Sequence, residues 1–511
     1  MPSTLALTLV IGLLAAAASS AAVGPRRPRL AVDIARAASA LGLAGTIVLA
    51  IAARSTDQSA GGLLVLDGLG TTLSVFVLGM AVVVTSFASR SLAIHRHAER
   101  FFAAATALAG STVVLVLANR PAVMALGWVM VSMSTVWLIG SDGRPASLRA
   151  ARRAARAFII GDVALLAATV LALVSTDGAT STVAVATAVG RRDGVGLLVA
   201  AGVVLGALAR SAQVPFHGWL PASVDAPTPV SAMLHAGVVN GSAVLMLRWY
   251  PAVQASSVIV VLAVATGLTG ILLGMAVGRT RADVKGGLAW TTVAQMGFMT
   301  IQCALGLVGP AVIHLIAHGM FKSSLFLGSG SALRSGSAHP HTAATHRRPI
   351  ELIASGAGGG LAVAVALAVV RPVHLGSGVS VIPIAFTWAT ASYALWQWRA
   401  ARTTSSTLLP IAIAACAATL TLGIAAGVES WIGIDWTSPS NQLQTVLAAV
   451  VVLTVFGAWL IGAVLPRLPA KWSDAAWMRV ATLATPRSSV ADTGDDRRPH
   501  ATSLTLTRTH A

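Results

Sequence analysis

Long apolar runs alternate with short polar loops along almost the whole chain. Lipid offers the backbone no hydrogen-bond partners, so an apolar run of about 20 residues that crosses a bilayer must be helical. The pattern therefore predicts an all-α fold, a polytopic membrane bundle of about 14–15 transmembrane helices. The predicted spans lie near residues 4–22, 37–53, 68–89, 101–118, 121–140, 157–176, 195–212, 229–248, 256–277, 286–306, 309–329, 350–370, 380–397, 407–427 and 443–464.

The two ends of the chain differ from this pattern. The first run ends in the small residues Ala15–Ala22, as a signal peptide does, but it lacks a basic start and Arg26 and Arg27 follow it. We interpret it as a retained first helix. From about residue 484 the chain is rich in Arg, Thr, Ser, His and Asp without an apolar period, so this tail is predicted to be disordered.

Composition and charge support a membrane protein. Apolar residues make up 56% of the 511 positions and charged residues only 10%, whereas a soluble domain carries about 25% charge. The net charge of +18 comes from arginines in short loops, which indicates positive-inside topology rather than nucleic-acid binding. The alternation of basic and neutral loops predicts an outside N-terminus and a cytoplasmic C-terminus in a cell membrane. Arg191 and Arg192 are exceptions to the positive-inside rule, because this topology places their loop outside the cell.

The segment from Arg210 to Asn240 interrupts two apolar runs with charge, histidine and proline. Pro215 cannot donate a backbone hydrogen bond, so a helix through residues 195–212 is predicted to break there and to resume near 217–225. Freed carbonyls would then face a polar interior, with Arg210 beside the break and His235 about two turns into the next helix. The alternative is an ordinary loop between two spans, with His235 as a satisfied core histidine.

A second group of polar residues lies on one helix. His314, His318 and Lys322 are spaced i, i+4 and i+8, which puts them on one face; we call them the titratable row. Charge at mid-membrane costs roughly 2.5–3.5 kcal/mol per residue, so such a row indicates a proton relay. A structural role is the alternative. A metal site is not expected, because no acidic or cysteine partner is near and Cys303 and Cys416 both lie in apolar runs.

Three further sets of residues have less decisive patterns. Lys285 precedes an apolar helix and follows the basic residues Arg279 and Arg281, so snorkelling to the interface and function are equal interpretations. Asp162 is a lone carboxylate in an apolar run, either protonated or paired with a base such as Arg210. The remaining set, in a polar loop, is interpreted as solvated and comprises His339, His341 and His346.

At these residues the sequence resembles the proton-conducting membrane transporter family. That family includes the antiporter-like subunits of respiratory complex I, subunit L above all, and of Mrp-type cation/proton antiporters. The match covers roughly residues 60–330 and is densest at 210–240 and 283–331. The resemblance implies antiporter-like inverted repeats with broken helices around a central polar axis.

The resemblance also implies ion-translocation roles. Arg210 falls where the family has its broken-helix lysine, His235 on the histidine of the following helix, and Asp162 on its Gly-Asp. The titratable row falls on the family's His–His–Lys set, and Lys285 is a further candidate. We therefore divide the chain into N-terminal helices (1–60), an ion-translocating core (61–330), C-terminal helices (331–470) and a cytoplasmic tail (471–511).

The sequence departs from the complex I members at several positions. Their glutamate after the tryptophan of the fifth helix is absent from Gly127-Trp128-Val129-Met130. Arg210 replaces a lysine, and arginine stays protonated and is a poor proton carrier. The later-helix lysine and the long C-terminal amphipathic helix of subunit L have no counterpart. The sequence motif His-Ala-Gly-Val-Val-Asn, which ends at Asn240, is similar instead to that of the DabB membrane subunits of DAB-type inorganic carbon pumps.

This second resemblance implies a function and a partner. The implied function is the membrane subunit of an energy-coupled CO2/bicarbonate pump, in which H+ or Na+ flow drives one-way CO2 hydration. The hydration would take place on a cytoplasmic, DabA-like zinc subunit that resembles carbonic anhydrase. The chain itself is expected to be a transporter subunit without a cofactor, a metal or a nucleic-acid partner. The alternatives are an antiporter-like subunit of a respiratory NADH–quinone oxidoreductase or Mrp complex, and an assembly subunit that has lost conduction.

Overall fold

The computed structural model describes residues 2–53, 62–93, 95, 97–176, 178–281, 283–334, 349–370, 378–401, 408–432, 442–464 and 478. Within these ranges the chain is helical and contains no β-strand beyond one isolated bridge between Leu64 and Ala118. The predicted tail, apart from Met478, and the loop histidines at 339, 341 and 346 lie outside the described residues.

The described residues of the first half form eleven α-helices, one short 3-10 helix and one short π-helix. They are α1 (Pro2–Val23), α2 (Pro28–Ala53), α3 (Gly68–Ser91), α4 (Ala98–Leu117), α5 (Pro121–Ile139), α6 (Pro145–Val174), α7 (Thr182–Gly190), α8 (Asp193–Arg210), α9 (Trp219–Ala222), η1 (Ser223–Asp225), α10 (Thr228–Met233), the π-helical η2 (Leu234–Val238) and α11 (Gly241–Arg248). The described remainder consists of α12 (Tyr250–Gln254), α13 (Ser257–Thr280), α14 (Val284–Ala304), α15 (Val308–Arg334), α16 (Pro349–Val370), η3 (Gly378–Ser380), α17 (Val381–Ala401), α18 (Leu408–Ile432) and α19 (Gln442–Val464).

The prediction of an all-α polytopic bundle is confirmed. Every predicted apolar run falls on a helix or, for residues 229–248, on the consecutive helical segments α10, η2 and α11. Twelve helices of the described chain are long and apolar enough to cross a membrane, fewer than the predicted 14–15. The difference lies in α14, α17 and α19, since α14 carries several polar side chains and the apolar part of α19 is shorter. The protein is therefore a multi-pass membrane protein.

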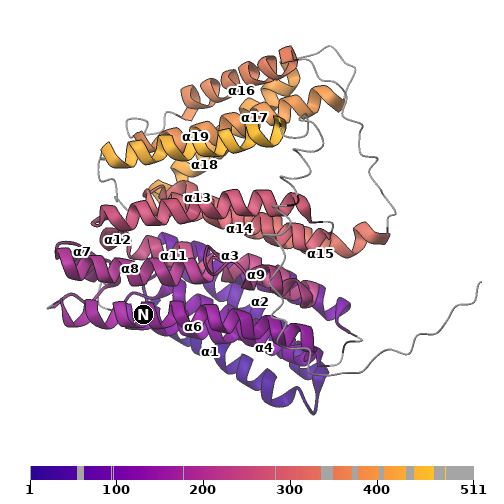
Figure 1. The fold of residues 1–511 in the computed structure, drawn as a ribbon. Coiled ribbons are helices and arrows are strands. Elements are labelled where there is room, and N and C mark those ends of the chain that lie inside the picture. The colour runs from indigo at the N-terminus through magenta and orange to yellow at the C-terminus, as the bar shows by residue number, and fades with distance from the viewer. Residues whose placement is uncertain are drawn as a thin grey trace, which may run out of the picture.

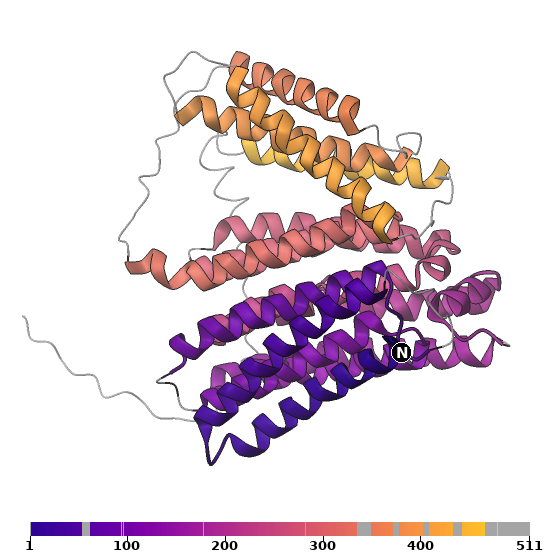
Figure 2. The ribbon, with the colours of Figure 1, turned by 180° about the vertical axis from the view of Figure 1, so that it is seen from behind.

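The helices lie roughly side by side in successive layers (Figure 1). The helices from α1 to α12 form one end of the bundle, and α13, α14 and α15 form a middle layer. The remaining helices, α16 to α19, lie beyond that layer, as the reverse view also shows (Figure 2). The main apolar core runs through the first two parts, while α16 and α18 add a small cluster of their own around Ala418 and Leu422. The middle layer is therefore enclosed on both sides.

Glycines bring α6 and α8 unusually close together. A Cβ at Gly202 would lie 2.6 Å from the Ala164 carbonyl oxygen, and one at Gly161 would lie 2.7 Å from the Cβ of Ala209. Small residues permit such close helix packing in lipid. Since Gly161 precedes Asp162 and Ala209 precedes Arg210, the same crossing places this acid and this base together.

The chain leaves α8 immediately after Arg210 and forms no helix longer than four residues until α10. The intervening residues contain Pro215 and the short elements α9 and η1. The Trp219 indole Nε1 donates to the Ala209 carbonyl oxygen at 3.0 Å, so the segment folds back on the end of α8. The next three segments, α10, η2 and α11, together form the most enclosed of the twelve spans. The break is therefore packed against the end of α8, with Pro215 exposed at its surface.

Candidate functional site

Arg210 lies at the C-terminal end of α8, and its side chain is only 1% exposed. Its Nη2 donates to the Trp128 carbonyl oxygen at 2.9 Å and to Ser132 Oγ at 2.5 Å. The same nitrogen lies 3.5 Å from Asp162 Oδ1, and Ser132 Oγ donates to that oxygen at 2.9 Å. We call Arg210, Asp162, Ser132 and Trp128 the arginine centre. Asp162 thus pairs with Arg210, the base that the sequence analysis named as a possible partner.

An aromatic ring covers the guanidinium. The Arg210 Cζ lies 3.8 Å from the centroid of the Trp128 ring and 5.5 Å from that of Phe158. A guanidinium that is stacked, hydrogen-bonded and paired keeps its charge, because arginine is not deprotonated in proteins. The arginine centre is therefore a fixed positive charge with a carboxylate beside it, and a poor place for a proton to be exchanged.

The titratable row continues into a second helix. Along α15 the ring centroids of His314 and His318 are 6.0 Å apart. The ring of His235, from η2, lies 6.4 Å from His318 and stacks on Phe326 at 4.5 Å. His235 is 1% exposed and His318 is 4% exposed. The structure therefore brings His235 together with the row, in the interior of the bundle and away from lipid.

Hydrogen bonds hold the two ends of the row. Lys322 Nζ donates to Thr291 Oγ1 at 2.6 Å and to the Leu288 carbonyl oxygen at 3.2 Å, both on α14. At the other end His314 Nδ1 lies 2.8 Å from Gln302 Oε1, also on α14. These contacts fix Lys322 at one end of a line of polar side chains and His314 at the other, with His318 between them.

The middle of the line is different. Neither ring nitrogen of His318 has a hydrogen-bond partner within the described ranges, and Nδ1 of His235 has none either. A buried polar group left unpaired costs about 1–3 kcal/mol, and buried water is the usual partner of such groups. Imidazoles that bond to water can pass a proton along it. The middle of the line therefore suits water-mediated proton transfer.

Lys285 does not join this line. It is half-buried near the start of α14, where its Nζ donates to the Ala226 carbonyl oxygen at 3.3 Å. Pro215 is exposed at the rim of a polar cavity of about 780 Å³ that the break shares with α6 and the start of α14. The arginines that line the same cavity are Arg149, Arg153 and Arg156 of α6 and Arg281.

His217 lines the same cavity and lies outside the twelve spans. Its ring centroid is 5.9 Å from that of Trp290, and its Nδ1 is buried without a partner among the described residues. Burial lowers the pKa of His217 below its ordinary value of 6.5. Sequence reasoning did not single this residue out, although it stands two positions after Pro215 in the polar segment between α8 and α10.

A second buried ion pair was also missed. Arg248, at the end of α11, donates through Nη2 to Asp67 Oδ1 at 2.9 Å and to the Val116 carbonyl oxygen at 3.2 Å, and its Nη1 pairs with Asp67 Oδ2. Asp67 also caps α3 by accepting from the Gly70 N–H. In the sequence Asp67 stands at the start of one apolar run and Arg248 at the end of another. A charge at such a position is easily interpreted as a residue at the membrane interface. This pair fastens α11 to α3.

Comparison with known proteins fits this arrangement. Residues 118–348 match the family model of the transmembrane NADH:quinone oxidoreductase/Mrp antiporter proteins. This segment of the chain is similar to that family. It contains the arginine centre, the break, His235 and the titratable row, so the family resemblance predicted from the sequence is confirmed.

Individual relatives come from two functional groups. The chain is 34% identical over 339 residues to the probable inorganic carbon transporter subunit DabB1 of Halothiobacillus neapolitanus, covering 61% of this chain and 60% of that protein. It is 34% identical over 277 residues to the DabB subunit of Bacillus anthracis, covering 53% of each. It is 31% identical over 279 residues to NADH-quinone oxidoreductase subunit L of Mycobacterium tuberculosis, covering 53% of this chain and 43% of that subunit. The chain thus spans between 43% and 60% of the length of these relatives.

A solved structure shares the fold. The Mrp complex from Dietzia sp. DQ12-45-1b aligns with 93% of this chain and 52% of its own chain, with a TM-score of 0.59 and 23% sequence identity. The antiporter-like helical bundle therefore extends beyond residue 348 into the layer of α16 to α19.

Proposed function

We propose that the protein is the membrane subunit of an energy-coupled inorganic carbon pump. The observation that supports this most is the buried line of His235 and the titratable row, in a chain similar to DabB subunits. Such a line suits ion flow, and the DabB names supply inorganic carbon as the cargo. The missing acid after Trp128 also separates the chain from the complex I members.

In this proposal the two polar groups have different tasks. A proton enters or leaves at Lys322, which Thr291 and the Leu288 carbonyl hold in place. It passes along His318 and His235 through water and reaches His314 at the Gln302 end. The arginine centre does not carry the proton; its fixed charge sets the potential that the proton meets near the break. A Na+ ion would use the same carbonyl and hydroxyl oxygens instead.

The carbon chemistry is assigned to a partner. We infer a DabA-like cytoplasmic subunit whose zinc, as in carbonic anhydrase, activates water for attack on CO2. Ion flow through the present chain would make that hydration one-way. The membrane subunit would thus supply energy without binding the metal, and its cytoplasmic end is the expected docking face.

Growth of a carbonic-anhydrase-deficient strain at ambient CO2 tests the proposal. Co-expression of this chain with its DabA-like partner is expected to restore growth, and the chain with His318→Ala is not. Met320→Ala is the matched control, because Met320 lies on the same helix but is 57% exposed. Absence of rescue by the wild-type pair, with both subunits present in the membrane fraction, would reject the proposal.

An antiporter-like subunit of a respiratory or Mrp complex is the second candidate. It is favoured by the 31% identity to subunit L and by the shared fold of the Mrp complex. Neighbouring genes discriminate: a large zinc-protein gene supports carbon uptake, and a run of respiratory or antiporter subunit genes supports the alternative. An assembly subunit without conduction is the third candidate, and rescue by the His318→Ala variant would support it.

A further inference from the structure

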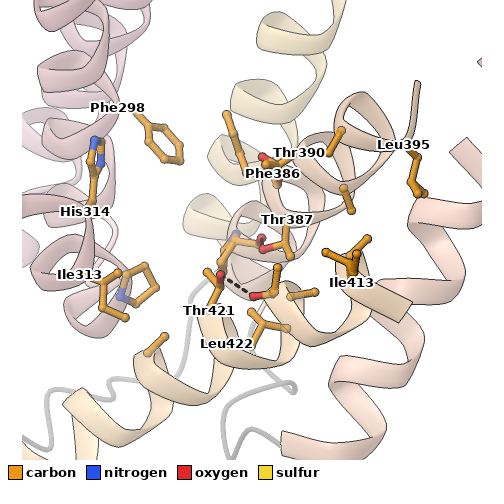
Figure 3. Close-up of a pocket in the computed structure, with 18 of the residues that line it drawn as sticks. Phe298, Ile313, His314, Phe386, Thr387, Thr390, Leu395, Ile413, Thr421 and Leu422 are labelled. Carbon is orange, nitrogen blue, oxygen red and sulfur yellow. Dashed lines mark hydrogen bonds between the residues drawn. The ribbon is translucent and has the colours of Figure 1, made fainter. Parts of the chain in front are cut away.

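One step of the polar line passes from one helical element to another. Lys322, His318 and His314 all lie on α15, where helix geometry fixes their spacing. Figure 3 shows His314 at the far end of the row, beside a cavity of about 500 Å³ between the middle layer and the C-terminal helices. His235 lies on η2 instead, with its ring centroid 6.4 Å from that of His318. This gap depends on how η2 is held against α15.

The element that carries His235 is a single π-helical turn, Leu234–Val238. The Val239 N–H bonds to the Leu234 carbonyl oxygen, five residues back, at 3.3 Å. Such turns are rare in proteins and occur mostly inside α-helices at functional sites. Because this turn departs from the regular helix of α10 and α11 on either side, its position depends on contacts from outside its own backbone.

Asn240, two residues after this turn, supplies such contacts and is only 2% exposed. Its Nδ2 donates to the carbonyl oxygens of His235 at 3.3 Å and Ala236 at 3.1 Å. The same nitrogen donates to the Leu315 carbonyl oxygen on α15 at 3.3 Å. Three carbonyl oxygens around one amide atom identify it as the nitrogen, since an oxygen there would face only acceptors. Its Oδ1 accepts no hydrogen bond from the described part of the chain, so the NH2 group makes the contacts of this side chain.

Three points join this helical stretch to α15, and each is four residues from the next on both helices. They are Asn240 with Leu315, Ala236 with Gly319, and Ala232 with Ser323. At the middle point a Cβ on Gly319 would lie 3.3 Å from the Ala236 carbonyl oxygen, so the helices approach closely there. His235 and His318 each directly precede the residue at that point. The imidazole pair therefore lies between the two outer points, which are hydrogen bonds.

From these contacts we propose that Asn240 is a positioning residue that sets the gap between His235 and His318. One amide group holds the carbonyl of His235 itself and the backbone of α15, and so fixes the two imidazoles relative to each other. Proton transfer between them needs this spacing, because a misplacement of about 1 Å can cost a reaction about 100-fold in rate. This inference rests on the proton flow of the proposed function and is independent of the carbon cargo.

Hydrogen–deuterium exchange of the purified full chain in nanodiscs tests the tie between η2 and α15. Asn240→Leu keeps the size of the side chain but removes the donor. Peptides that cover Leu234–Val238 should then exchange about fivefold faster, as the net loss of one hydrogen bond implies. Ser242→Ala is the matched control, because the buried Ser242 hydroxyl donates to the Val239 carbonyl oxygen of its own helix, and exchange should stay unchanged. Equal exchange in Asn240→Leu and the unmodified chain would overturn the proposal.

Proton flux tests what the tie does for the line. The full chain is reconstituted in liposomes with an imposed membrane potential, and a pH-sensitive dye records the flux in H2O and in D2O. In Asn240→Leu the flux per folded molecule should fall about tenfold, on the scale of a misplaced reacting group. The ratio of flux in H2O to flux in D2O should rise, because the step to His318 then limits the rate. A purely structural role would lower the amount of folded protein and leave that ratio unchanged, which would overturn the proposal.

Asn240→Ser covers the case in which Asn240→Leu does not fold. A serine hydroxyl can donate to the carbonyl four residues back, that of Ala236, but is too short to reach Leu315 on α15. This variant should conduct as poorly as Asn240→Leu, and flux equal to that of the unmodified chain would overturn the proposal. An unmodified chain that conducts no protons would reject the proposed proton flow, and the role of the gap with it, whereas the exchange measurement decides the tie by itself.

Discussion

The arginine centre and the titratable row are two buried polar groups in one bundle, and they are built in opposite ways. At the arginine centre one guanidinium nitrogen reaches a carbonyl, a hydroxyl and a carboxylate, and Trp128 covers its face. In the titratable row the terminal residues are bonded, but both nitrogens of His318 lack a partner in the described structure. In the first group protein atoms hold Nη2 of Arg210, although its Nε and Nη1 are buried without a partner in the described structure, whereas in the second the central imidazole has no protein partner at all.

Because of this difference, the arginine centre suits a fixed charge and the titratable row suits the transfer of a proton. A buried arginine beside a carboxylate gives a constant electrostatic potential, because arginine is not deprotonated in proteins. Imidazoles exchange protons readily near neutral pH when their nitrogens bond to water. The exchange of the family's lysine for Arg210 therefore need not end conduction, provided that the histidine end still works.

The largest expected effect concerns the ion pair of the arginine centre. Asp162→Ala would leave Arg210 buried without its carboxylate, and breaking a buried pair costs about 3–5 kcal/mol. We expect a loss of this order in the unfolding free energy of the purified protein, measured with denaturant. Adding Arg210→Leu should recover much of it, because no unpaired charge then remains. A double variant that is less stable than Asp162→Ala would contradict the ion-pair interpretation.

The middle of the row comes next. His318→Ala should lower coupled activity about 100-fold, the scale on which positioned proton carriers act, with little change in protein level. Inorganic carbon uptake by the co-expressed pair measures this, with Met320→Ala as the lipid-facing control. If His318→Ala retained full activity, the row would be structural, and proton transfer would not distinguish it from the arginine centre.

The hydrogen bond that holds Lys322 offers a sharper test. Thr291→Val removes the hydroxyl 2.6 Å from Nζ, and a bond to a charged group is worth about 1.5–3 kcal/mol. Activity should fall about tenfold if the fixed position of the ammonium matters. Thr300→Val is the matched control, because Thr300 is buried on the same helix and its hydroxyl donates to the Met296 carbonyl oxygen, away from Lys322. Equal losses in both variants would point to α14 packing instead.

Arg210→Lys should have the smallest effect. The charge remains, while the stacking on Trp128 is weakened, a contribution of about 0.5–2 kcal/mol. We expect a modest fall in melting temperature and carbon uptake close to that of the unmodified pair. Uptake that collapsed as in His318→Ala would show that the guanidinium geometry, and not only its charge, takes part in conduction.

The sequence by itself determined the fold class and most of the polar residues. Apolar runs of spanning length must be helices in lipid, so their places could be read directly from the chain. Their number was overestimated, since twelve helices of the described chain qualify as spans. The spacing within α15 placed its histidines and lysine on one face for the same geometric reason.

Only the tertiary structure decided which of these residues meet. Helical spacing says nothing about the neighbour across an interface, so His235 on η2 could not be assigned to His318 by periodicity. Lys285, equally polar in sequence, lies instead against Ala226. Nor could the chain alone show that Ser132, Thr291 and Gln302 are hydrogen-bond partners, because small polar side chains in apolar helices most often bond to their own backbone. Packing between helices determines which hydrogen-bond partners meet, and close glycine contacts determine where α6 and α8 cross.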